Sequence, residues 1–497
     1  MKIYLEGNEY KYAAEQILLM MFPEERPEYP DGNFSGEENS CLIKVTRGVK
    51  FATASAKICR SGKSAVGVSK TAESGITDKL TEDRLLQKII KLAFYKAAAE
   101  LTGTHPAWGA LTGIRPGKLV TNMLESGSTE EAAIKRMCRD FFVSPERAAL
   151  CLDTAKAGIA VKNSLDERDI AIYVGIPFCP TRCAYCSFVS HSVEKSMKLI
   201  QPFLEALERE IEETAETVKK LGLRVISVYM GGGTPTTISA QQMDRLLKKI
   251  AECFDLSAVT EYTVEAGRPD TITPEKLNVL RNNGVTRVSI NPQTMSNKVL
   301  QTIGRRHTAA EVIDAYHMAR DAGIGAVNMD LIAGLPADNI DSFRNTLDTV
   351  LELDPENVTV HTLSLKKGTK ITLEGTELPS PDEVGEMLDY AAEKLRANGY
   401  VPYYLYRQKF MSGGFENVGW CKPGFESLYN ILIMEELCTI LALGGGGSTK
   451  LTAPKKGKIQ RVFNAKYPYE YINSMDKIIS SKRQIEDFYN NEVLGAE

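Results

Sequence analysis

Residues 173–186 read Tyr-Val-Gly-Ile-Pro-Phe-Cys-Pro-Thr-Arg-Cys-Ala-Tyr-Cys, and this stretch decides how the chain folds. Its first part is an apolar run typical of a buried strand, which ends in a loop bounded by prolines. Three of the ten cysteines, Cys179, Cys183 and Cys186, fall within eight residues of that loop. Three thiolates at this spacing can surround one small inorganic centre, whereas an odd number on one tight loop cannot pair internally as disulfides.

Two kinds of metal centre are open from these residues alone. A structural zinc site takes four ligands, and the nearest polar candidates for the fourth are Ser187 and His191. An iron–sulfur cube usually takes four cysteines, so a loop with three would leave one iron open to another ligand. The spacing favours the iron–sulfur centre, with a zinc knuckle or buried thiols without a metal as the alternatives.

The loop resembles the cluster-binding signature of the radical S-adenosylmethionine (SAM) enzymes, in which the open iron chelates SAM. The surrounding Tyr-x-Gly-Ile-Pro-Phe-Cys-x-x-x-Cys-x-Tyr-Cys-Ser-Phe is similar to the branch that contains oxygen-independent coproporphyrinogen III oxidase and its relatives. This resemblance implies a 4Fe-4S cluster on Cys179, Cys183 and Cys186, SAM as the second cofactor, and a one-electron donor such as flavodoxin or ferredoxin as a partner.

The composition sets the class of protein. The chain has 497 residues, of which 43% are hydrophobic and 25% charged, which predicts a globular protein of two to four domains. A net charge of -4 gives no basic surface for a nucleic acid. We find neither a signal peptide nor a run of about 18 apolar residues, so we expect a cytoplasmic protein without a membrane span. The seven other cysteines are scattered, which is typical of reduced thiols.

Strand and helix patterns alternate from residue 171 to about residue 365, within a barrel domain predicted at residues 166–375. Near-continuous apolar strands separated by amphipathic helices indicate a parallel sheet covered by helices. Six such units predict a partial (β/α)6 barrel of the α/β class, and the resemblance implies the same radical SAM fold. The six strands are expected at 171–176, 225–230, 260–265, 286–290, 325–331 and 357–363, with helices at 197–221, 239–254, 274–283, 309–322 and 342–353.

The segments on either side of the barrel are predicted to form smaller modules. Residues 1–80 predict a small α+β module, and residues 81–165 follow a helical period. Together they form an α+β and helical N-terminal extension. Residues 376–497 predict a smaller C-terminal α+β domain that covers the substrate, with a helix near 383–398 and an aromatic strand near 400–406.

Polar groups follow the predicted strands where each strand ends, which is where barrels of this kind carry their ligand-binding groups. Gly231-Gly232-Gly233-Thr234 follows the second strand, and glycines let the backbone approach a ligand. Later strands end at Glu265, at Asn291 to Gln293, at Asp330 and at His361 to Ser364. Each residue alone could be an ordinary turn or helix cap. Their combination with a cysteine trio favours a binding site.

The resemblance implies SAM contacts for nine residues. A guanidinium suits the SAM carboxylate because its fork matches two oxygens. The nine are Tyr173, Tyr185, Gly232, Gly233, Thr234, Glu265, Gln293, Arg305 and Asp330. The motif that begins at Glu265 departs from the family pattern Glu-Ala-x-Pro, because two residues, Gly267 and Arg268, separate Ala266 from Pro269.

The same resemblance implies the chemistry. One electron from the cluster cleaves SAM to methionine and a 5'-deoxyadenosyl radical, which abstracts a hydrogen atom from a propionate that then loses carbon dioxide to become a vinyl group. A tetrapyrrole needs an aromatic wall and cations for its carboxylates. We expect these from Tyr406, Arg407 and Trp420, with aromatic packing of the C-terminal domain as the alternative.

The sequence departs from the archetypal oxidase at Phe188, where that enzyme has a further cysteine separated from the trio by one residue. With an N-terminal extension of about 165 residues, the chain most resembles the coproporphyrinogen dehydrogenase HemZ type. Three functions follow from the resemblance. They are oxygen-independent decarboxylation of coproporphyrinogen III to protoporphyrinogen IX, haem delivery by a haem chaperone, and haem degradation by a radical SAM methyltransferase.

Overall fold

A computed structural model of the chain describes residues 1–186, 191–364, 369, 371, 373, 375–408 and 412–495, with the backbone alone at 191–195 and 412. The chain divides into two compact units, residues 1–152 with 413–415, and residues 153–412 with 416–497. Each unit contains a sheet of its own. The division at residues 80, 165 and 375 that the sequence suggests stays a prediction.

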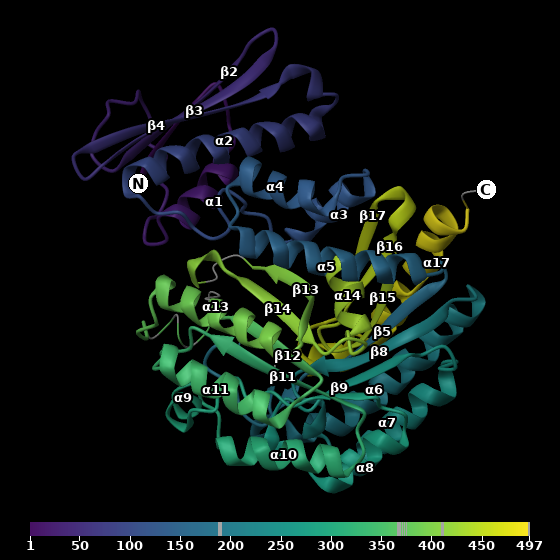
Figure 1. Cartoon of the computed structure of the whole chain (residues 1–497). Helices are drawn as coiled ribbons and strands as arrows, with labels where there is room; N and C mark the ends of the chain where they lie inside the picture. The colour runs from purple at the N-terminus through teal and green to yellow at the C-terminus, as the bar shows by residue number, and fades with distance from the viewer. Residues whose placement is uncertain are drawn as a thin grey trace. The chain divides into compact units, whose positions relative to one another are not determined.

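The first unit is an α+β module followed by helices, drawn in purple and blue in Figure 1. Its sheet has the order β1-β2-β3-β4, with β1 parallel to β2 and the other pairs antiparallel. Alternate strand residues such as Ala54 and Ile58 are fully buried and share a core with Ile17 and Ile90 of the helices. The elements are β1 (Lys2–Glu6), α1 (Lys11–Met21), β2 (Ser40–Arg47), β3 (Phe51–Arg60), β4 (Lys63–Ala72), α2 (Lys79–Thr102), α3 (Gly117–Glu125), α4 (Glu130–Phe141) and α5 (Pro145–Ser164), whose last residues belong to the second unit.

The second unit is built on one sheet with the strand order β13-β14-β12-β11-β10-β9-β8-β5-β15-β16-β17. Its six central strands run parallel and lie within two residues of the predicted ones, which confirms the partial (β/α)6 barrel. They are β5 (Asp169–Ile176), β8 (Arg224–Gly232), β9 (Glu261–Glu265), β10 (Arg287–Ser289), β11 (Ala326–Ala333) and β12 (Asn357–Thr362).

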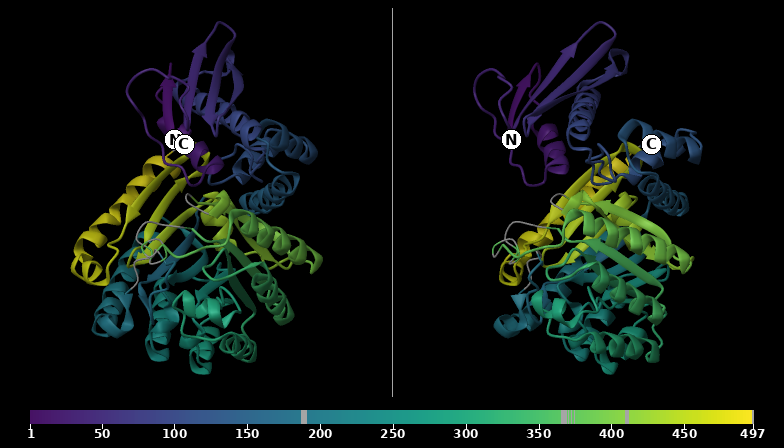
Figure 2. Two further views of the ribbon diagram at one scale, coloured as in Figure 1. Left: turned by 90° about the vertical axis from the view of Figure 1, so that its left-hand side faces the viewer. Right: turned by 60° about the vertical axis from the view of Figure 1, so that its left-hand side comes forward.

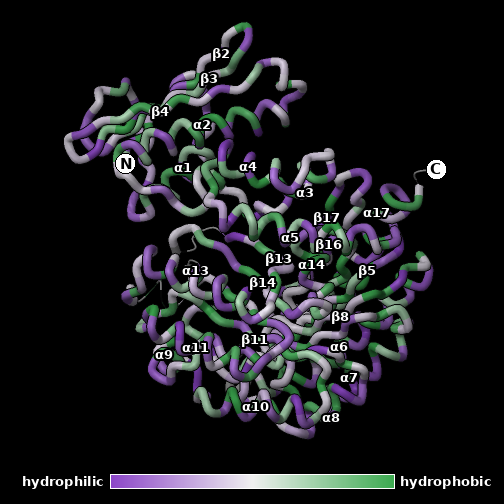
Figure 3. Tube along the Cα trace, in the orientation of Figure 1, coloured by the Kyte–Doolittle hydropathy of each residue, from purple (hydrophilic) through white to green (hydrophobic). Residues whose placement is uncertain are grey.

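Helices follow the central strands and lie along the outer side of the sheet in Figures 1 and 2. Capping boxes at Ser239 and Thr308 fix where two of them begin. Hydrophobic residues concentrate on the strands in Figure 3, and hydrophilic ones on the outer turns of the helices. No helix among the described residues is long and apolar enough to cross a membrane. The helices are α6 (Val193–Lys220), α7 (Ala240–Cys253), α8 (Pro274–Asn282), α9 (Asn297–Thr302), α10 (Ala309–Asp321) and α11 (Ile340–Leu353).

The C-terminal residues extend the same sheet at both edges. On one side β14 (Glu416–Cys421) pairs antiparallel with β12, and β13 (Val401–Arg407) follows. On the other side β15 (Thr439–Gly444) pairs in parallel with β5, and β16 (Ser448–Ala453) and β17 (Lys458–Phe463) continue antiparallel. The remaining helices are α13 (Pro381–Ala397), α14 (Leu428–Glu435), α15 (Pro468–Asn473), α16 (Met475–Ser481) and α17 (Arg483–Phe488). Strands on both sides of residue 375 therefore share one sheet.

A buried ion pair ties the C-terminal helices to α6. Lys482 Nζ lies 2.6 Å from Glu210 Oε1, and the two side chains are 6% and 0% exposed. Glu210 also accepts hydrogen bonds of 2.8 Å from the Gly444 backbone and from Asn464 Nδ2. Removing one partner of such a pair leaves an uncompensated buried charge, which is strongly destabilising. These contacts therefore hold β15 and the C-terminal helices in place.

Candidate active site

A cavity of about 600 Å³ opens at the carboxyl ends of the six parallel strands. Every residue that the sequence suggested for a cluster or for SAM lines it. These are Cys179, Cys183 and Cys186, together with Tyr173, Tyr185, Gly232, Gly233, Thr234, Glu265, Gln293, Arg305 and Asp330. The fold therefore gathers at one place residues that are up to 157 positions apart in the chain, from Tyr173 to Asp330. Their roles as ligands stay predictions.

Backbone hydrogen bonds hold the cysteine loop against the glycine turn that follows β8. Gly233 N donates to Ile176 O at 2.8 Å, and Thr234 N donates to Phe178 O at 2.7 Å. A Cβ on Gly233 would lie 2.4 Å from Phe178 O, so only glycine allows this approach. Further along the loop, Ala184 N donates to Ile303 O at 3.0 Å. Main-chain contacts thus fix both ends of the cysteine loop.

The three cysteines of the loop are suited to an iron–sulfur cluster. None of the ten cysteines, all of which are described, forms a disulfide. In the described part of the chain, no three His, Cys, Asp or Glu side chains lie close enough together to hold one metal ion. Thiolates of a cluster bind different irons and stand further apart than the ligands of a single ion. Three thiols on one cavity wall are a donor set that fits an iron–sulfur cluster. Ser187, Phe188 and the His191 side chain lie outside the described residues.

Arg305 joins the cysteine loop to the loops that follow β9 and β10. Its Nη1 donates to Gly267 O at 2.8 Å and to Asn291 O at 3.2 Å, and its Nη2 donates to Tyr185 OH at 2.9 Å. The side chain is 8% exposed and lines the cavity, and its buried Nε has no hydrogen-bond partner among the described residues. A guanidinium at the wall of a cavity can attract an anionic group of a ligand.

A hydrogen-bond network orients Asp330 across β10, β11 and β12. Asn328 Nδ2 donates to Asp330 Oδ1 at 2.8 Å, and His361 Nε2 lies 3.8 Å from Asp330 Oδ2. Burial alone would raise the pKa of Asp330, but the nearby His361 and the hydrogen bond from Asn328 hold it below its usual value. Asp330 is therefore a charged acceptor at neutral pH.

Glu265 lies near Asp330, but its pKa is shifted upward whereas that of Asp330 is shifted downward. Burial is the main cause that raises the pKa of Glu265 to about 7, and the nearby Asp330 adds to the effect. Tyr229 OH donates to Glu265 Oε1 at 2.7 Å, which partly offsets the rise. When the pKa values of two neighbouring carboxyl groups differ in this way, one group can accept hydrogen bonds as a carboxylate and the other can donate one as a carboxylic acid.

Replacing Glu265 with glutamine is expected to stabilise the ligand-free protein above pH 7 and to change little near pH 4. A carboxyl whose pKa rises from 4.5 to about 7 keeps its proton in the folded state where the unfolded chain has lost it. Stability therefore falls as the pH increases through this window, by about 3 kcal/mol in total. Thermal unfolding at about pH 5 and about pH 8 measures the effect. The exposed Glu216→Gln is the control, and an E265Q difference that does not grow with pH would contradict the prediction.

Tyrosines form one wall of the cavity. The rings of Tyr173, Tyr229 and Tyr429 stack, with centroids 6.3 Å apart for the first pair and 4.4 Å for the second. Tyr404 and Tyr406 stack at 6.2 Å. All five line the cavity. This surface can pack against the face of a flat or aromatic ligand.

Helix α14, which carries Tyr429, is fixed by a buried carboxylate below the cavity. Glu261 accepts from Leu428 N at 2.7 Å and from Ser427 Oγ at 3.0 Å. Arg287 Nη1 lies 2.6 Å from Glu261 Oε2, and both side chains are buried. A carboxylate at the first turn of a helix is favoured by the helix dipole. Glu261 therefore positions the tyrosine wall without contacting the cavity.

The three predicted substrate residues are placed differently. Tyr406 lines the cavity, whereas Arg407 and Trp420 do not. The Trp420 ring is 2% exposed and lies 5.4 Å from the Arg396 guanidinium, which favours the alternative of aromatic packing. Tyr229, Arg268 and Asn328 line the cavity but were missed from the sequence. For Arg268 the departure from the family motif was an available signal.

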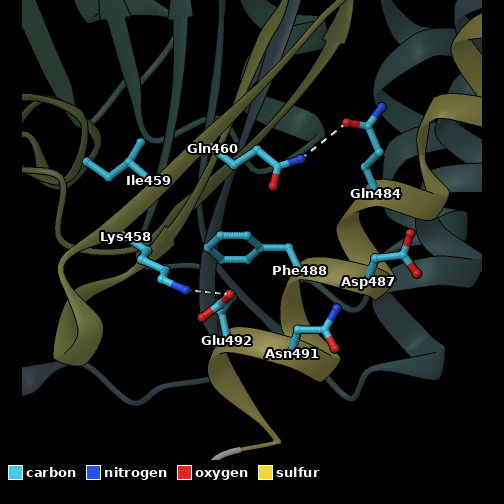
Figure 4. Close-up of a pocket in the computed structure, with 8 residues that line it drawn as sticks. All are labelled: Lys458, Ile459, Gln460, Gln484, Asp487, Phe488, Asn491 and Glu492. Carbon is cyan, nitrogen blue, oxygen red and sulfur yellow. Dashed lines mark hydrogen bonds and ion pairs between the residues drawn. The ribbon is translucent and has the colours of Figure 1, made fainter.

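A second, smaller cleft of about 280 Å³ lies between β17 and the C-terminal helices (Figure 4). Gln460 Nε2 donates to Gln484 Oε1 at 3.2 Å across it, and Lys458 Nζ lies 2.8 Å from Glu492 Oε1. None of the residues singled out in the sequence lines this cleft. We therefore assign the candidate active site to the larger cavity.

Known proteins resemble this chain in sequence and in structure. The family model of the radical SAM superfamily matches residues 173–350. The chain is 39% identical to the oxygen-independent coproporphyrinogen-III oxidase-like protein HemZ of Bacillus subtilis, over 82% of each chain. It is 33% identical to the heme chaperone HemW of Lactococcus lactis, over 65% of this chain and 80% of HemW. The structure of coproporphyrinogen III oxidase (HemN) from Escherichia coli, a radical SAM enzyme, matches with a TM-score of 0.52 and 25% identity over 65% of this chain and 72% of that chain.

Proposed function

Because this chain belongs to the radical SAM superfamily, in the branch of oxygen-independent coproporphyrinogen III oxidase-like proteins, we propose that it oxidatively decarboxylates coproporphyrinogen III. One observation carries the proposal. The three cysteines of the loop and the stacked tyrosines line the same cavity, so a metal cluster and the face of a tetrapyrrole could meet there. The proposed products are protoporphyrinogen IX and carbon dioxide.

The residues of the cavity have distinct proposed tasks. Cys179, Cys183 and Cys186 hold a 4Fe-4S cluster. Arg305 receives the SAM carboxylate with its guanidinium at the cavity wall, and the backbone of Gly232 and Gly233 receives the methionyl amine. The bound cluster and SAM together supply a carbon-centred radical that can abstract a hydrogen atom from the substrate.

The acidic and amide groups on the far side of the cavity orient the nucleoside. Asp330, charged and fixed by Asn328, accepts hydrogen bonds from ribose hydroxyls. Glu265 stands beside it and, when protonated, donates one. Gln293 is held by backbone hydrogen bonds to Asp330 O and from Ile332 N, of 2.9 and 3.0 Å, which fixes its place at the cavity wall. These residues bind and orient the cofactor and keep water away from the reacting atoms.

The substrate lies against the tyrosine wall. Each propionate would give up one hydrogen atom to the radical, one electron to a one-electron acceptor and its carboxylate as carbon dioxide, and so become a vinyl group. A one-electron donor of the ferredoxin or flavodoxin kind supplies the electron that each radical requires. Tyr406 and Tyr429 contact the macrocycle, since aromatic faces pack well on one another.

The proposal is tested with protein reconstituted with iron and sulfide in the absence of oxygen. Incubation with reductant, SAM and coproporphyrinogen III should yield vinyl products and carbon dioxide, detected by mass spectrometry, together with methionine and 5'-deoxyadenosine. Cleavage of SAM without decarboxylation of the porphyrinogen would refute the proposed substrate. Transfer of a labelled methyl group to a linear tetrapyrrole would identify a methyltransferase instead.

The similarity to HemW favours a second candidate function, haem delivery. The same tyrosine wall could hold haem as a cargo. This function predicts a stoichiometric haem complex that survives gel filtration and passes its haem to an acceptor protein. A protein that decarboxylates coproporphyrinogen and retains no haem would exclude it.

A further inference from the structure

Arg268 contacts the cysteine loop through its guanidinium. It follows β9, lines the cavity and is 3% exposed. Its Nη1 donates to Cys183 Sγ at 3.4 Å, and its Nη2 donates to Thr181 Oγ1 at 2.9 Å. One guanidinium thus contacts a proposed cluster ligand and a second residue of the same loop.

Asp270 holds this guanidinium in place. Arg268 Nε lies 3.2 Å from Asp270 Oδ1, and Nη2 lies 3.4 Å from Oδ2. A carboxylate that faces both nitrogens fixes the plane of the fork. Nη1, which contacts the sulfur, is left directed at Cys183. The guanidinium of Arg268 is therefore held by Asp270 and by two residues of the cysteine loop.

His307 lies next to Asp270 and adds no charge there at neutral pH. Its side chain is fully buried, with Nδ1 3.9 Å from Asp270 Oδ1. Burial, with Arg305 and Arg268 as further causes, lowers the pKa of His307 to about 4, so the ring is neutral. Arg268, Asp270 and the nearby Arg305 are then the charged groups around this contact. Of these, Arg268 is the one that touches the sulfur.

The position of Arg268 coincides with the departure of this chain from the family motif. The pattern Glu-Ala-x-Pro has one residue between alanine and proline, whereas this chain has Gly267 and Arg268. Gly267 packs against Asn291, and its carbonyl accepts from Arg305. The longer segment therefore both keeps the Arg305 contact and adds a donor to Cys183.

We infer that Arg268, held by Asp270, is a positioning residue that fixes Cys183 and raises the reduction potential of the cluster that this loop is proposed to bind. The inference rests on the proposed function, in so far as it requires a cluster. Reduction adds one electron from a low-potential donor, and so one negative charge, to a centre held by thiolates. A buried cation that donates to one of the sulfurs stabilises the more negative state.

The test is a potentiometric titration of the reconstituted protein, followed by electron paramagnetic resonance. Arg268→Gln should keep its iron but show a lower midpoint potential, by about tenfold in the reduction equilibrium constant, or 59 mV for a one-electron couple. Arg320→Gln is the matched control, because Arg320 lies on α10 and pairs with Glu356 outside the cavity. Its potential should equal that of the wild type.

A second variant keeps the inference testable if R268Q fails to retain its cluster. Asp270→Asn removes a negative charge beside the retained cation, while its amide oxygen can still accept from Arg268. Its potential should rise. Iron-loaded R268Q with the wild-type potential would overturn the inference, as would an unchanged potential in D270N if R268Q holds no iron. A wild-type protein that takes up no cluster would instead refute the proposed function.

Discussion

Replacing Cys183 with serine is expected to abolish cluster binding and all cleavage of SAM. Iron should fall from about four atoms per chain to near zero, because two thiolates and a hydroxyl hold a cluster poorly. Removing a residue that only hydrogen-bonds to a metal ligand already lowers metal affinity or activity about 10- to 100-fold. Removing a ligand itself should therefore lower cluster affinity by more than about 100-fold. Iron and sulfide analysis after anaerobic reconstitution, with chromatography of 5'-deoxyadenosine, measures both.

Cys253 supplies the control for that experiment. It lies on α7 in the same unit as the loop, is partly exposed and does not line the cavity. Cys253→Ser should load iron as the wild type does, which separates a specific ligand loss from a general effect of removing a thiol. A C183S protein that keeps its iron and cleaves SAM would refute the assignment of the loop as the cluster site.

Replacing Arg305 with glutamine is expected to weaken SAM binding by on the order of 100-fold, the lower end of what removal of one partner from a buried charged pair costs. Arg305→Lys should weaken it by roughly 10-fold, because lysine keeps the charge but not the two-pronged geometry. Equilibrium dialysis with labelled SAM on the cluster-loaded protein gives the dissociation constants directly.

Arg305 also holds the loops of the site together, so the effect of its replacement on stability has to be measured separately from the effect on SAM binding. Its Nη1 holds the carbonyls of Gly267 and Asn291, and thermal unfolding of the ligand-free variants reports the loss of these contacts. Arg281→Gln is the control, since Arg281 Nε donates to the Gly323 carbonyl at the protein surface. Wild-type SAM affinity in a folded R305Q would show that another group receives the carboxylate.

The barrel could be predicted from the sequence because each of its strands and helices has a pattern that is visible within its own residues. Each central strand is a short apolar run followed by a helical period, and polar residues stand where the strands end. The rule that strand ends carry the ligand groups then places Glu265 and Asp330 on one edge of the sheet, and the structure has both in one cavity.

What could not be predicted depends on contacts between distant segments. Nothing in Leu428 to Leu443 indicates that it divides into helix α14 and strand β15, or that β15 pairs with β5 more than 260 residues earlier. The stacking of Tyr229 on Tyr429 depends on that arrangement. Trp420 was expected at the substrate because an aromatic residue in a polar loop region looks the same in sequence whether it binds a ligand or fills a core.

The pairing of β15 with β5 also determines when the edge of β5 becomes covered during synthesis. The strand that leads into the cysteine loop has β8 as a neighbour early, but its other edge stays open until residues 439–444 have left the ribosome. Glu210 likewise waits for Lys482 before its buried charge is compensated. An open strand edge is prone to pair with other chains. The nascent protein therefore holds β5, the strand that leads into the cysteine loop, with one edge unpaired from the synthesis of β8 until residues 439–444 have been made.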